Sequence, residues 1–313
     1  MFRLTILNFK NAIKSSETLF GLGTEVTAAI FYAWSVSVSM DGIVLGSVFC
    51  ILPAIAGVFI TFALTVDNEA GTVRNRIIAG YSRIKILLSQ VFAAMLLSLV
   101  YILLSMIPVL ILCHNTIGRG RTTTEVWYAL VVIICCYFIG AVLGAVLATL
   151  LFSRGAAILL YIMIYVGLSF AAGSINIYEN KYDRFHNIIS YNFLSGDVTE
   201  NPRYIPEPVR TILKPLFFAS PLQQGIVYDF SSEADYKRRR TNINEDIEML
   251  HADMEAYPDT YKPSEHYEEY LYDELRVCEE YERDLRLIPL YSGIIILVFV
   301  GVGAAVYRKE NIC

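Results

Sequence analysis

Five runs of 18 to 28 residues contain no Asp, Glu, Lys or Arg, and they limit what this chain can fold into. The runs are residues 42–64, 86–113, 127–152, 156–173 and 287–307. A helix needs about 20 apolar residues to cross the hydrocarbon core of a bilayer. Only 18% of the residues are charged and the mean hydropathy is +0.50, so the chain lacks the polar surface of a soluble enzyme. The sequence therefore predicts an all-α membrane protein.

A sixth run, residues 19–40, is weaker because Glu25 interrupts it. Counting it as a span places ten basic residues of the short loops and chain ends on one side, against Arg119 and Arg121 on the other. The ten are Arg3, Lys10, Lys14, Arg74, Arg76, Arg83, Lys85, Arg154, Arg308 and Lys309. Because basic loop residues collect on the cytoplasmic side, we predict a multi-pass plasma-membrane protein with both termini in the cytoplasm.

This topology divides the chain into four parts. Residues 1–16 precede the first span, and residues 17–173 hold spans one to five. Residues 174–286 form an extracellular segment. Residues 287–313 hold the sixth span and a short cytoplasmic tail.

Small residues at helical spacing indicate where helices pack. Gly140 and Gly144 form one GxxxG pattern, and Gly42 and Gly46 form another. Such spacing lets two helix backbones approach closely in lipid. We expect helix–helix contacts at both patterns.

Neither the cysteines nor the histidines indicate a metal or redox site. The six cysteines show no CxxC spacing, and the four histidines form no HExxH pattern. Cys278 alone lies in a long polar stretch, where it either packs as a thiol or pairs with another subunit. We predict no metal and no catalytic residue.

Residues 66–85 are too polar to span a membrane, yet they are patterned like a helix. One apolar stripe follows helical spacing and consists of Val73, Ile77, Tyr81 and Ile84. A carboxylate such as that of Glu69 suits a helix N-terminus. We expect a short amphipathic helix at the cytoplasmic face, which either rests on lipid or binds a partner.

Seven residues of this segment stand in an order that is found in one transporter family. They are Glu69, Gly71, Thr72, Arg74, Asn75, Gly80 and Arg83. In this order they resemble the coupling-helix signature of ABC transporter permeases of the type-2 exporter class (ABCG-like, type V). That family has six spans, cytoplasmic termini and this segment between spans two and three, which is the layout predicted here.

The resemblance implies a division of labour between subunits. The permease holds the translocation path, while a separate cytoplasmic ATPase, which binds ATP and magnesium, contacts the coupling helix. The seven residues would face or shape that contact, and arginine is suited to bidentate pairing with acidic residues. The chain contains no GxxxxGKS or GxxxxGKT phosphate-binding pattern, so we expect no ATP hydrolysis in this chain. The family also implies a second permease subunit, identical or related.

The first sixteen residues also show a helical pattern. Their apolar stripe consists of Phe2, Ile6, Phe9 and Ile13, with basic residues elsewhere on the helix. This resembles the interfacial connecting helix that precedes the first span in the same family. A plain membrane-surface helix is the alternative.

The segment 174–286 is acidic and rich in tyrosine. It carries 13 basic and 23 acidic residues and 12 of the 21 tyrosines, whereas the rest of the chain has a net charge of +5. Prolines between residues 178 and 228 predict irregular structure with short elements. The acidic surface either keeps this segment soluble or receives a cationic substrate. The basic run from Lys237 to Arg240 faces solvent, acidic neighbours or lipid headgroups.

Two apolar stripes predict a helical hairpin in the later part of this segment. The first consists of Ile243, Ile247, Leu250 and Met254. The second consists of Tyr267, Leu271, Leu275, Cys278 and Leu285. Their spacing is helical, and the second helix points into the last span.

The predicted function is that of the permease subunit of an ATP-driven exporter of a hydrophobic or amphipathic substrate, such as a peptide antibiotic, a lipid or a drug. Glu25 is the one ionisable residue inside a span, which argues against an ion-driven carrier. Candidates for the substrate path are Glu25, Phe49, Phe59, Phe62, Tyr165 and Phe170. The alternative is a membrane sensor or antimicrobial-peptide immunity protein that binds a ligand outside without transport. The partners expected are the ATPase, a second permease subunit and membrane lipid, and the net charge of −5 argues against nucleic acid.

Overall fold

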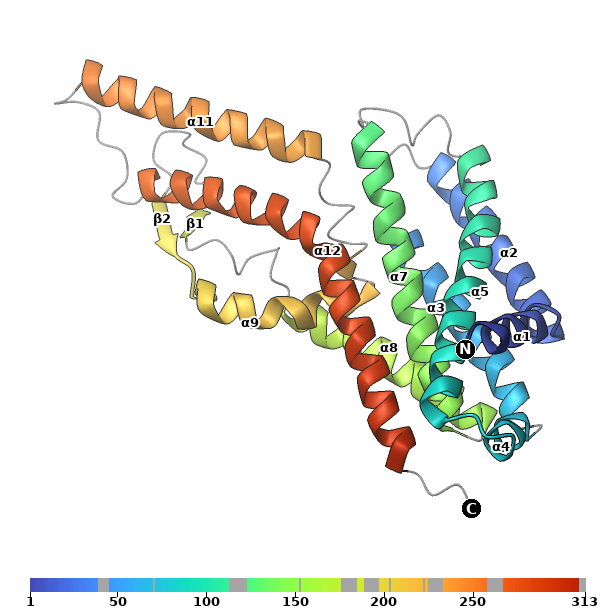
Figure 1. The fold of residues 1–313 in the computed structure, drawn as a ribbon. Helices are drawn as coiled ribbons and strands as arrows, with labels where there is room; N and C mark the ends of the chain where they lie inside the picture. Colours follow the sequence, from blue (N-terminus) through green and yellow to red (C-terminus); the bar gives the residue numbers. More distant parts are fainter. Residues whose placement is uncertain are drawn as a thin grey trace.

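The computed structural model describes residues 1–38, 45–69, 71–112, 123–151, 153–175, 185–188, 197–202, 204–221, 223–224, 233–257 and 267–309. Most of these residues form a helical bundle and a domain that projects from it (Figure 1). The bundle contains α1 (Phe2–Ile13), α2 (Ser16–Val38), α3 (Leu45–Glu69), α4 (Thr72–Ile78), α5 (Arg83–Leu112), α7 (Thr123–Leu150) and α8 (Arg154–Ile175), together with the second half of α12 (Tyr267–Lys309).

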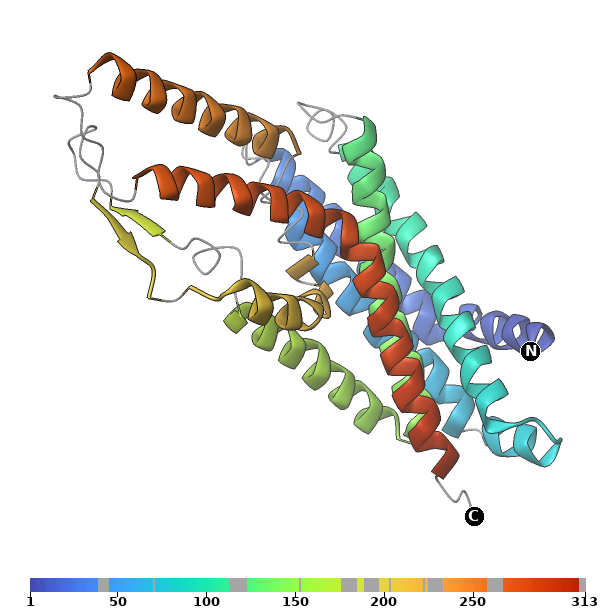
Figure 2. The same ribbon diagram turned by 60° about the vertical axis from the view of Figure 1, so that its left-hand side comes forward.

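The projecting domain lies at one end of the bundle, and Figure 2 shows it from a second side. It consists of β1 (Phe185–Ile188), β2 (Asp197–Glu200), α9 (Glu207–Phe218), α11 (Glu233–Ala256) and the first half of α12. The two strands are antiparallel, with Phe185 opposite Glu200. The predicted all-α class therefore holds except for this small sheet, which lies in the proline-rich stretch where we expected irregular structure with short elements.

Four helices among the described residues are long and apolar enough to cross a membrane. These stretches are Arg83–Ile111, Leu130–Leu150, Arg154–Gly173 and Arg286–Lys309, and Ile51–Val66 is a shorter apolar helix. The predicted first span, residues 19–40, coincides with α2 but is not among the four. Its helix includes Glu17, Glu25 and several Ser and Thr residues, which lower its hydropathy.

Close backbone contact joins α7 to α3, as the pattern of Gly140 and Gly144 predicts. A Cβ atom added at Gly140 would lie 3.1 Å from the carbonyl oxygen of Pro53, and one added at Gly144 would lie 3.1 Å from that of Gly57. Side chains larger than hydrogen would push the two helices apart. Gly42 lies outside the described residues, as does the surrounding of Gly46, so the second pattern stays a prediction.

The sixth predicted span and the helix before it are one element, α12, of 43 residues. Figures 1 and 2 show that α12 changes direction between its two halves. Pro289 lies inside it, and a proline bends a helix because it removes one backbone hydrogen bond.

The helical hairpin of the projecting domain is confirmed. Side chains from α11 and α12 form its core, which consists of Ile243, Ile247, Leu250, Leu271 and Cys278, with Tyr267, Tyr270 and Leu275 packed against it. Cys278 is a buried thiol, as the packing interpretation predicts. The prediction for Met254 is wrong, because it lies in the last turn of α11 with 40% of its surface exposed. The side chain of Leu285 is outside the described residues.

The first helix is present as predicted, and it packs on the bundle mainly through residues outside its predicted apolar stripe. In α1 the buried side chains are Leu4, Thr5, Asn8 and Ala12, whereas Phe2 and Ile6 are exposed. The amide of Asn8 donates a hydrogen bond to Ser89 of α5 at 3.1 Å. The predicted stripe is therefore divided: Phe9 and Ile13 pack against the core of the bundle, while Phe2 and Ile6 are exposed, where an interfacial helix would meet lipid.

Candidate functional site

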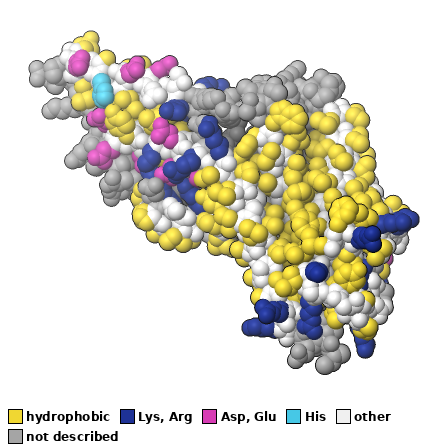
Figure 3. All heavy atoms as spheres, viewed as in Figure 1, with side chains coloured by type: hydrophobic (Ala, Val, Ile, Leu, Met, Phe, Trp, Pro, Cys, Tyr) yellow, Lys and Arg dark blue, Asp and Glu magenta, His cyan; other side chains and the backbone are white. Residues whose placement is uncertain are grey.

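The segment with the seven motif residues lies at the end of the bundle opposite the projecting domain, and we call this the α4 end. Contacts here include Glu69 with Arg154 and Arg83 with Tyr307, so the ends of α3 and α12 and the starts of α5 and α8 meet. The N-terminus and the end of α12 lie on this side of the molecule in Figure 1. Figure 3 shows Lys and Arg side chains gathered there, below a largely hydrophobic bundle surface.

Two glycines divide the expected helix of residues 66–85 into shorter pieces. Gly71 and Gly80 have φ values of 72° and 86°, and they are the described residues with positive φ. Helix α3 runs on to Glu69, α4 occupies only Thr72–Ile78, and α5 begins at Arg83. An added Cβ would meet nothing within 4 Å at either glycine. The two glycines therefore permit the positive φ that the turns require, and they do not serve to let another backbone approach closely.

The turn after α4 is a Schellman motif. The backbone N–H of Gly80 donates to the carbonyl of Ile77 at 2.9 Å, and that of Tyr81 donates to the carbonyl of Arg76 at 3.1 Å. These two bonds satisfy helix-end carbonyls and require a left-handed residue at position 80. As a result, the predicted stripe ends inside α4: Val73 is buried, while Tyr81 and Ile84 are exposed.

We expect Gly80→Ala to lower the free energy of unfolding by about 1 kcal/mol, since an L side chain is strained at φ 86°. Denaturant titration of the purified full chain in detergent micelles would measure this change. Gly155→Ala is the matched control, because its Cβ would also meet nothing within 4 Å and its φ is not positive. Equal effects of the two substitutions would contradict the role assigned to Gly80.

Two of the motif residues hold the segment in place. Glu69 pairs with the guanidinium of Arg154, and its other oxygen accepts the backbone N–H of Arg154 at 3.1 Å. Arg83 donates to the carbonyl oxygen of Tyr307 at 3.2 Å. These contacts tie the segment to the starts of α5 and α8 and to the end of α12.

The outward surface of α4 carries the remaining polar motif residues. Arg74 and Asn75 are exposed, Thr72 is half-buried, and Ile78 has 74% of its surface exposed. The surface therefore presents a cation, an amide and an apolar side chain together. This composition suits a protein surface that carries carboxylates beside an apolar groove.

A buried polar network that the sequence reasoning missed supports this end of the bundle. Asn68 of α3 accepts a hydrogen bond from Gln90 of α5 at 3.1 Å and donates to the carbonyl oxygen of Ala148. The hydroxyl of Thr149 of α7 donates to Gln90. Three helices are thereby joined directly behind α4. A lone amide within an apolar run, such as Gln90, is the signal that could have indicated it.

Glu25 lies inside the bundle with 1% of its surface exposed. The hydroxyl of Tyr137 of α7 donates to it at 2.5 Å, and Tyr137 also exchanges a hydrogen bond with Ser105 of α5 at 3.2 Å. Its second carboxylate oxygen has no hydrogen-bond partner among the described residues. The carboxylate thus joins α2 to α7, and Tyr137 links both to α5.

The structure does not bring the aromatic path candidates together. Phe59 packs edge-on against Phe20 with ring centroids 5.9 Å apart, and Phe62 lies 5.6 Å from the guanidinium of Arg154. Tyr165 is buried and stacked on Tyr161, whereas Phe170 is 76% exposed. The side chain of Phe49 lies outside the described residues.

A second cluster missed by the sequence reasoning lies where α9 meets α12. Arg210 pairs with Glu280 at 3.2 Å, and Lys214 pairs with Asp284 at 2.7 Å. Arg276 adds a contact of 3.1 Å to Glu280. Arg210, Lys214 and Asp284 have at most 4% of their side chains exposed. Matching pairs of opposite charge at i and i+4 on two helices were the available signal.

Gln224 anchors the projecting domain to the bundle. Its amide donates to the carbonyl of Phe218 at 2.6 Å and to the hydroxyl of Ser292 at 3.0 Å. Its side-chain oxygen accepts from the thiol of Cys136 at 3.4 Å. The domain, α7 and α12 are therefore connected at one fully buried side chain.

No family model matches the sequence, and a search of curated proteins finds no match. Among the residues that the structure describes, no group of three or more His, Cys, Asp or Glu could hold a metal ion.

Proposed function

We propose that this chain is the permease subunit of an ATP-driven exporter and that a cytoplasmic ATPase subunit binds at α4. The observation that supports this most is the exposed surface of α4, with Arg74 and Asn75, on a segment that Glu69 and Arg83 tie to other helices. A movement of α4 would displace α3, α5, α8 and α12 through these contacts.

The proposed topology has six spans with both termini in the cytoplasm of a plasma-membrane protein. All ten basic residues counted above belong to the described part of the chain. The α4 end carries most of them on α1, α4, the start of α8 and the end of α12. Such a bias favours the cytoplasm for this end and the external side for the projecting domain. In this topology α2 and α3 are two further spans, which together with the four longer apolar helices make six.

The substrate would be hydrophobic or amphipathic, and a second copy or a related permease would complete the path. The bundle has one buried carboxylate, that of Glu25, among the described side chains of its helices α2, α3, α5, α7 and α8. This supports a pump driven by a partner ATPase over a carrier driven by ions, which needs several ionisable residues in the membrane.

We expect an ATPase gene beside the gene of this chain, and the test is co-purification of the chain with that ATPase subunit. We expect Arg74→Ala to reduce ATPase retention about tenfold or more, since losing a charged contact at an interface costs more than 1 kcal/mol. Its free energy of unfolding should stay unchanged, because Arg74 is exposed. Arg308→Ala is the matched control, an exposed arginine at the same end of the bundle.

Glu69→Ala gives a second, different outcome. It removes the pair with Arg154, so ATP hydrolysis should lose its dependence on the permease even where the ATPase is retained. Unchanged retention and hydrolysis in both the Arg74 and Glu69 variants would reject the docking assignment and favour a ligand-binding protein without transport.

A further inference from the structure

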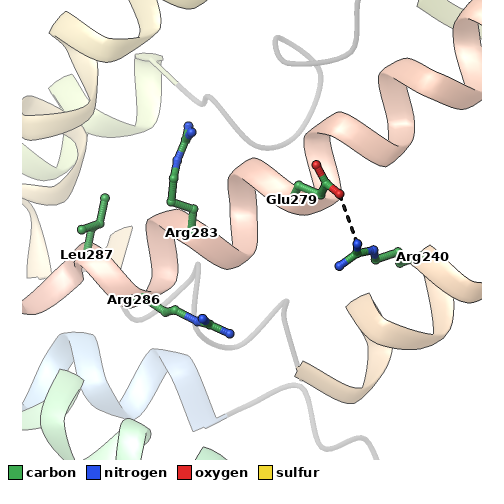
Figure 4. Close-up of a pocket in the computed structure, with 5 residues that line it drawn as sticks. All are labelled: Arg240, Glu279, Arg283, Arg286 and Leu287. Carbon is green, nitrogen blue, oxygen red and sulfur yellow. Dashed lines mark ion pairs between the residues drawn. The ribbon is translucent and has the colours of Figure 1, made fainter.

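A pocket of about 420 Å³ lies between α11 and α12, next to the point where α12 enters the bundle. Its lining residues are Arg240, Glu279, Arg283, Arg286 and Leu287 (Figure 4). Pockets of this size accommodate small ligands or lipid headgroups. Neither the α4 surface nor the buried charge cluster is part of it.

The described lining is strongly basic. Three arginines and one carboxylate belong to it; Arg240 pairs with Glu279 at 3.2 Å, and Arg283 lies 3.9 Å from Asp284, which is outside the lining. Arg240 and Glu279 are about half exposed, with 48% and 54% of their side chains accessible. An exposed pair of this kind contributes little to stability. A ligand with a stronger hydrogen-bond acceptor can therefore replace Glu279 as the partner of Arg240.

Figure 4 shows how the arginines are directed. Arg240 extends from α11 toward α12, while Arg286 extends from α12 toward the α11 side. Arg283 extends from α12 on the side away from α11 in this view. Guanidinium groups from two helices thus flank one space, and their planar forks suit phosphate oxygens.

The lining also includes an apolar side chain, which extends from α12 on the same side as Arg283 in Figure 4. Leu287 belongs to the lining, and Leu290, one turn further along α12, is 58% exposed. The membrane-compatible part of α12 begins at Arg286. A ligand with its anionic group among the arginines can therefore lay an acyl chain along α12.

Helix α9, which lies on the other side of α12 from α11 (Figures 1 and 2), also exposes an apolar face near the point where α12 enters the bundle. Its side chains Val209, Ile212 and Leu216 are exposed, with Ile212 at 77%, whereas Arg210 and Lys214 are buried on the opposite face. Helix α9 lies beside α8, where Ser220, directly after α9, is within 3.2 Å of Ser169. Figure 3 shows hydrophobic side chains along the edge of the projecting domain where Figure 1 draws α9. An exposed apolar stripe next to a membrane helix suits the boundary of headgroups and acyl chains.

We propose that this pocket binds the phosphate headgroup of an anionic membrane lipid, with Arg240 and Arg286 on the phosphate and Leu287 against the start of the chain. A free phosphate shares the same anionic chemistry, but it would leave the apolar side chain of Leu287 unused. The site does not depend on the ATPase assignment, since it lies at the other end of the bundle.

The test uses the purified full chain in detergent micelles with fluorescent phosphatidylglycerol, and phosphatidylcholine as the zwitterionic comparison. We expect the double variant Arg240→Gln/Arg286→Gln to weaken phosphatidylglycerol binding about tenfold or more, because each lost contact is charge-assisted. Arg238→Gln, an exposed arginine on α11 outside the pocket lining, should change it less than about twofold.

Glu279→Gln tests the same site in the opposite direction. It removes the carboxylate that occupies Arg240, so phosphatidylglycerol should bind about threefold more tightly, an effect that damage to the fold would not produce. Equal binding by the wild type and the double variant, or no preference over phosphatidylcholine, would overturn the proposal. Full competition by millimolar inorganic phosphate would identify a free-anion site and overturn the lipid assignment.

Discussion

Lys214→Met should destabilise the chain by roughly 3–5 kcal/mol, which is the usual cost of leaving a buried charge without its partner. Lys214 lies 2.7 Å from Asp284, whose side chain is only 1% exposed. Arg283 approaches the same carboxylate only to 3.9 Å. Denaturant titration of the purified full chain in detergent micelles, followed by circular dichroism, measures the loss.

The control compares this pair with an exposed one in the same domain. Arg239 pairs with Glu274 at 2.6 Å, but 52% of its side chain is exposed, so Arg239→Met should cost less than about 1 kcal/mol. The double variant Lys214→Met/Asp284→Leu should recover most of the lost stability, because an apolar pair replaces the buried ions. If Lys214→Met costs no more than Arg239→Met, the pair with Asp284 does not hold α9 on α12.

Gly144→Leu should cost about 3 kcal/mol, because the seam between α7 and α3 has no space for a side chain. A Cβ at this position would lie 3.1 Å from the carbonyl oxygen of Gly57 and press against the side chain of Thr61. Both are parts of α3, which cannot move without disturbing the network of Asn68. Unfolding in detergent micelles would report the loss as a lower denaturant midpoint.

Gly301→Leu is the matched control for this substitution. Gly301 also lies in an apolar helix, but an added Cβ would meet nothing within 4 Å and the residue is exposed. Its change should stay within about 0.5 kcal/mol. Similar losses of unfolding free energy for both substitutions would show that helix propensity, and not the close contact between α7 and α3, determines the result.

The predictions from the sequence succeeded where a pattern was local. The GxxxG pair at Gly140 and Gly144 marked a close helix contact, and the stripes at Ile243 and Leu271 marked the hairpin core. Both follow from spacing along one helix, which the sequence shows directly. The stripe of α1 was only half informative, because spacing cannot say whether an apolar face meets protein or lipid, and Phe2 and Ile6 remain exposed.

The sequence predicted one amphipathic helix within residues 66–85, but Gly71 and Gly80 divide this segment into shorter pieces. Helical spacing joined Val73 to Ile84, but Gly80 adopts a left-handed conformation that ends α4. The motif residues then fall into two groups that spacing does not separate. Glu69 and Arg83 make contacts within the chain, while Arg74 and Asn75 stay exposed.

By itself, the sequence determined that the chain has several apolar runs long enough to cross a membrane, one acidic segment and a basic remainder, because apolar run length and charge are properties of the chain alone. Only the tertiary structure decided which polar residues meet. Asn68 and Gln90 are 22 positions apart, and Lys214 and Asp284 are 70 apart. The basic pocket at Arg240 and Arg286 likewise arises where two helices face each other. Such contacts depend on how the helices pack, which short-range periodicity does not encode.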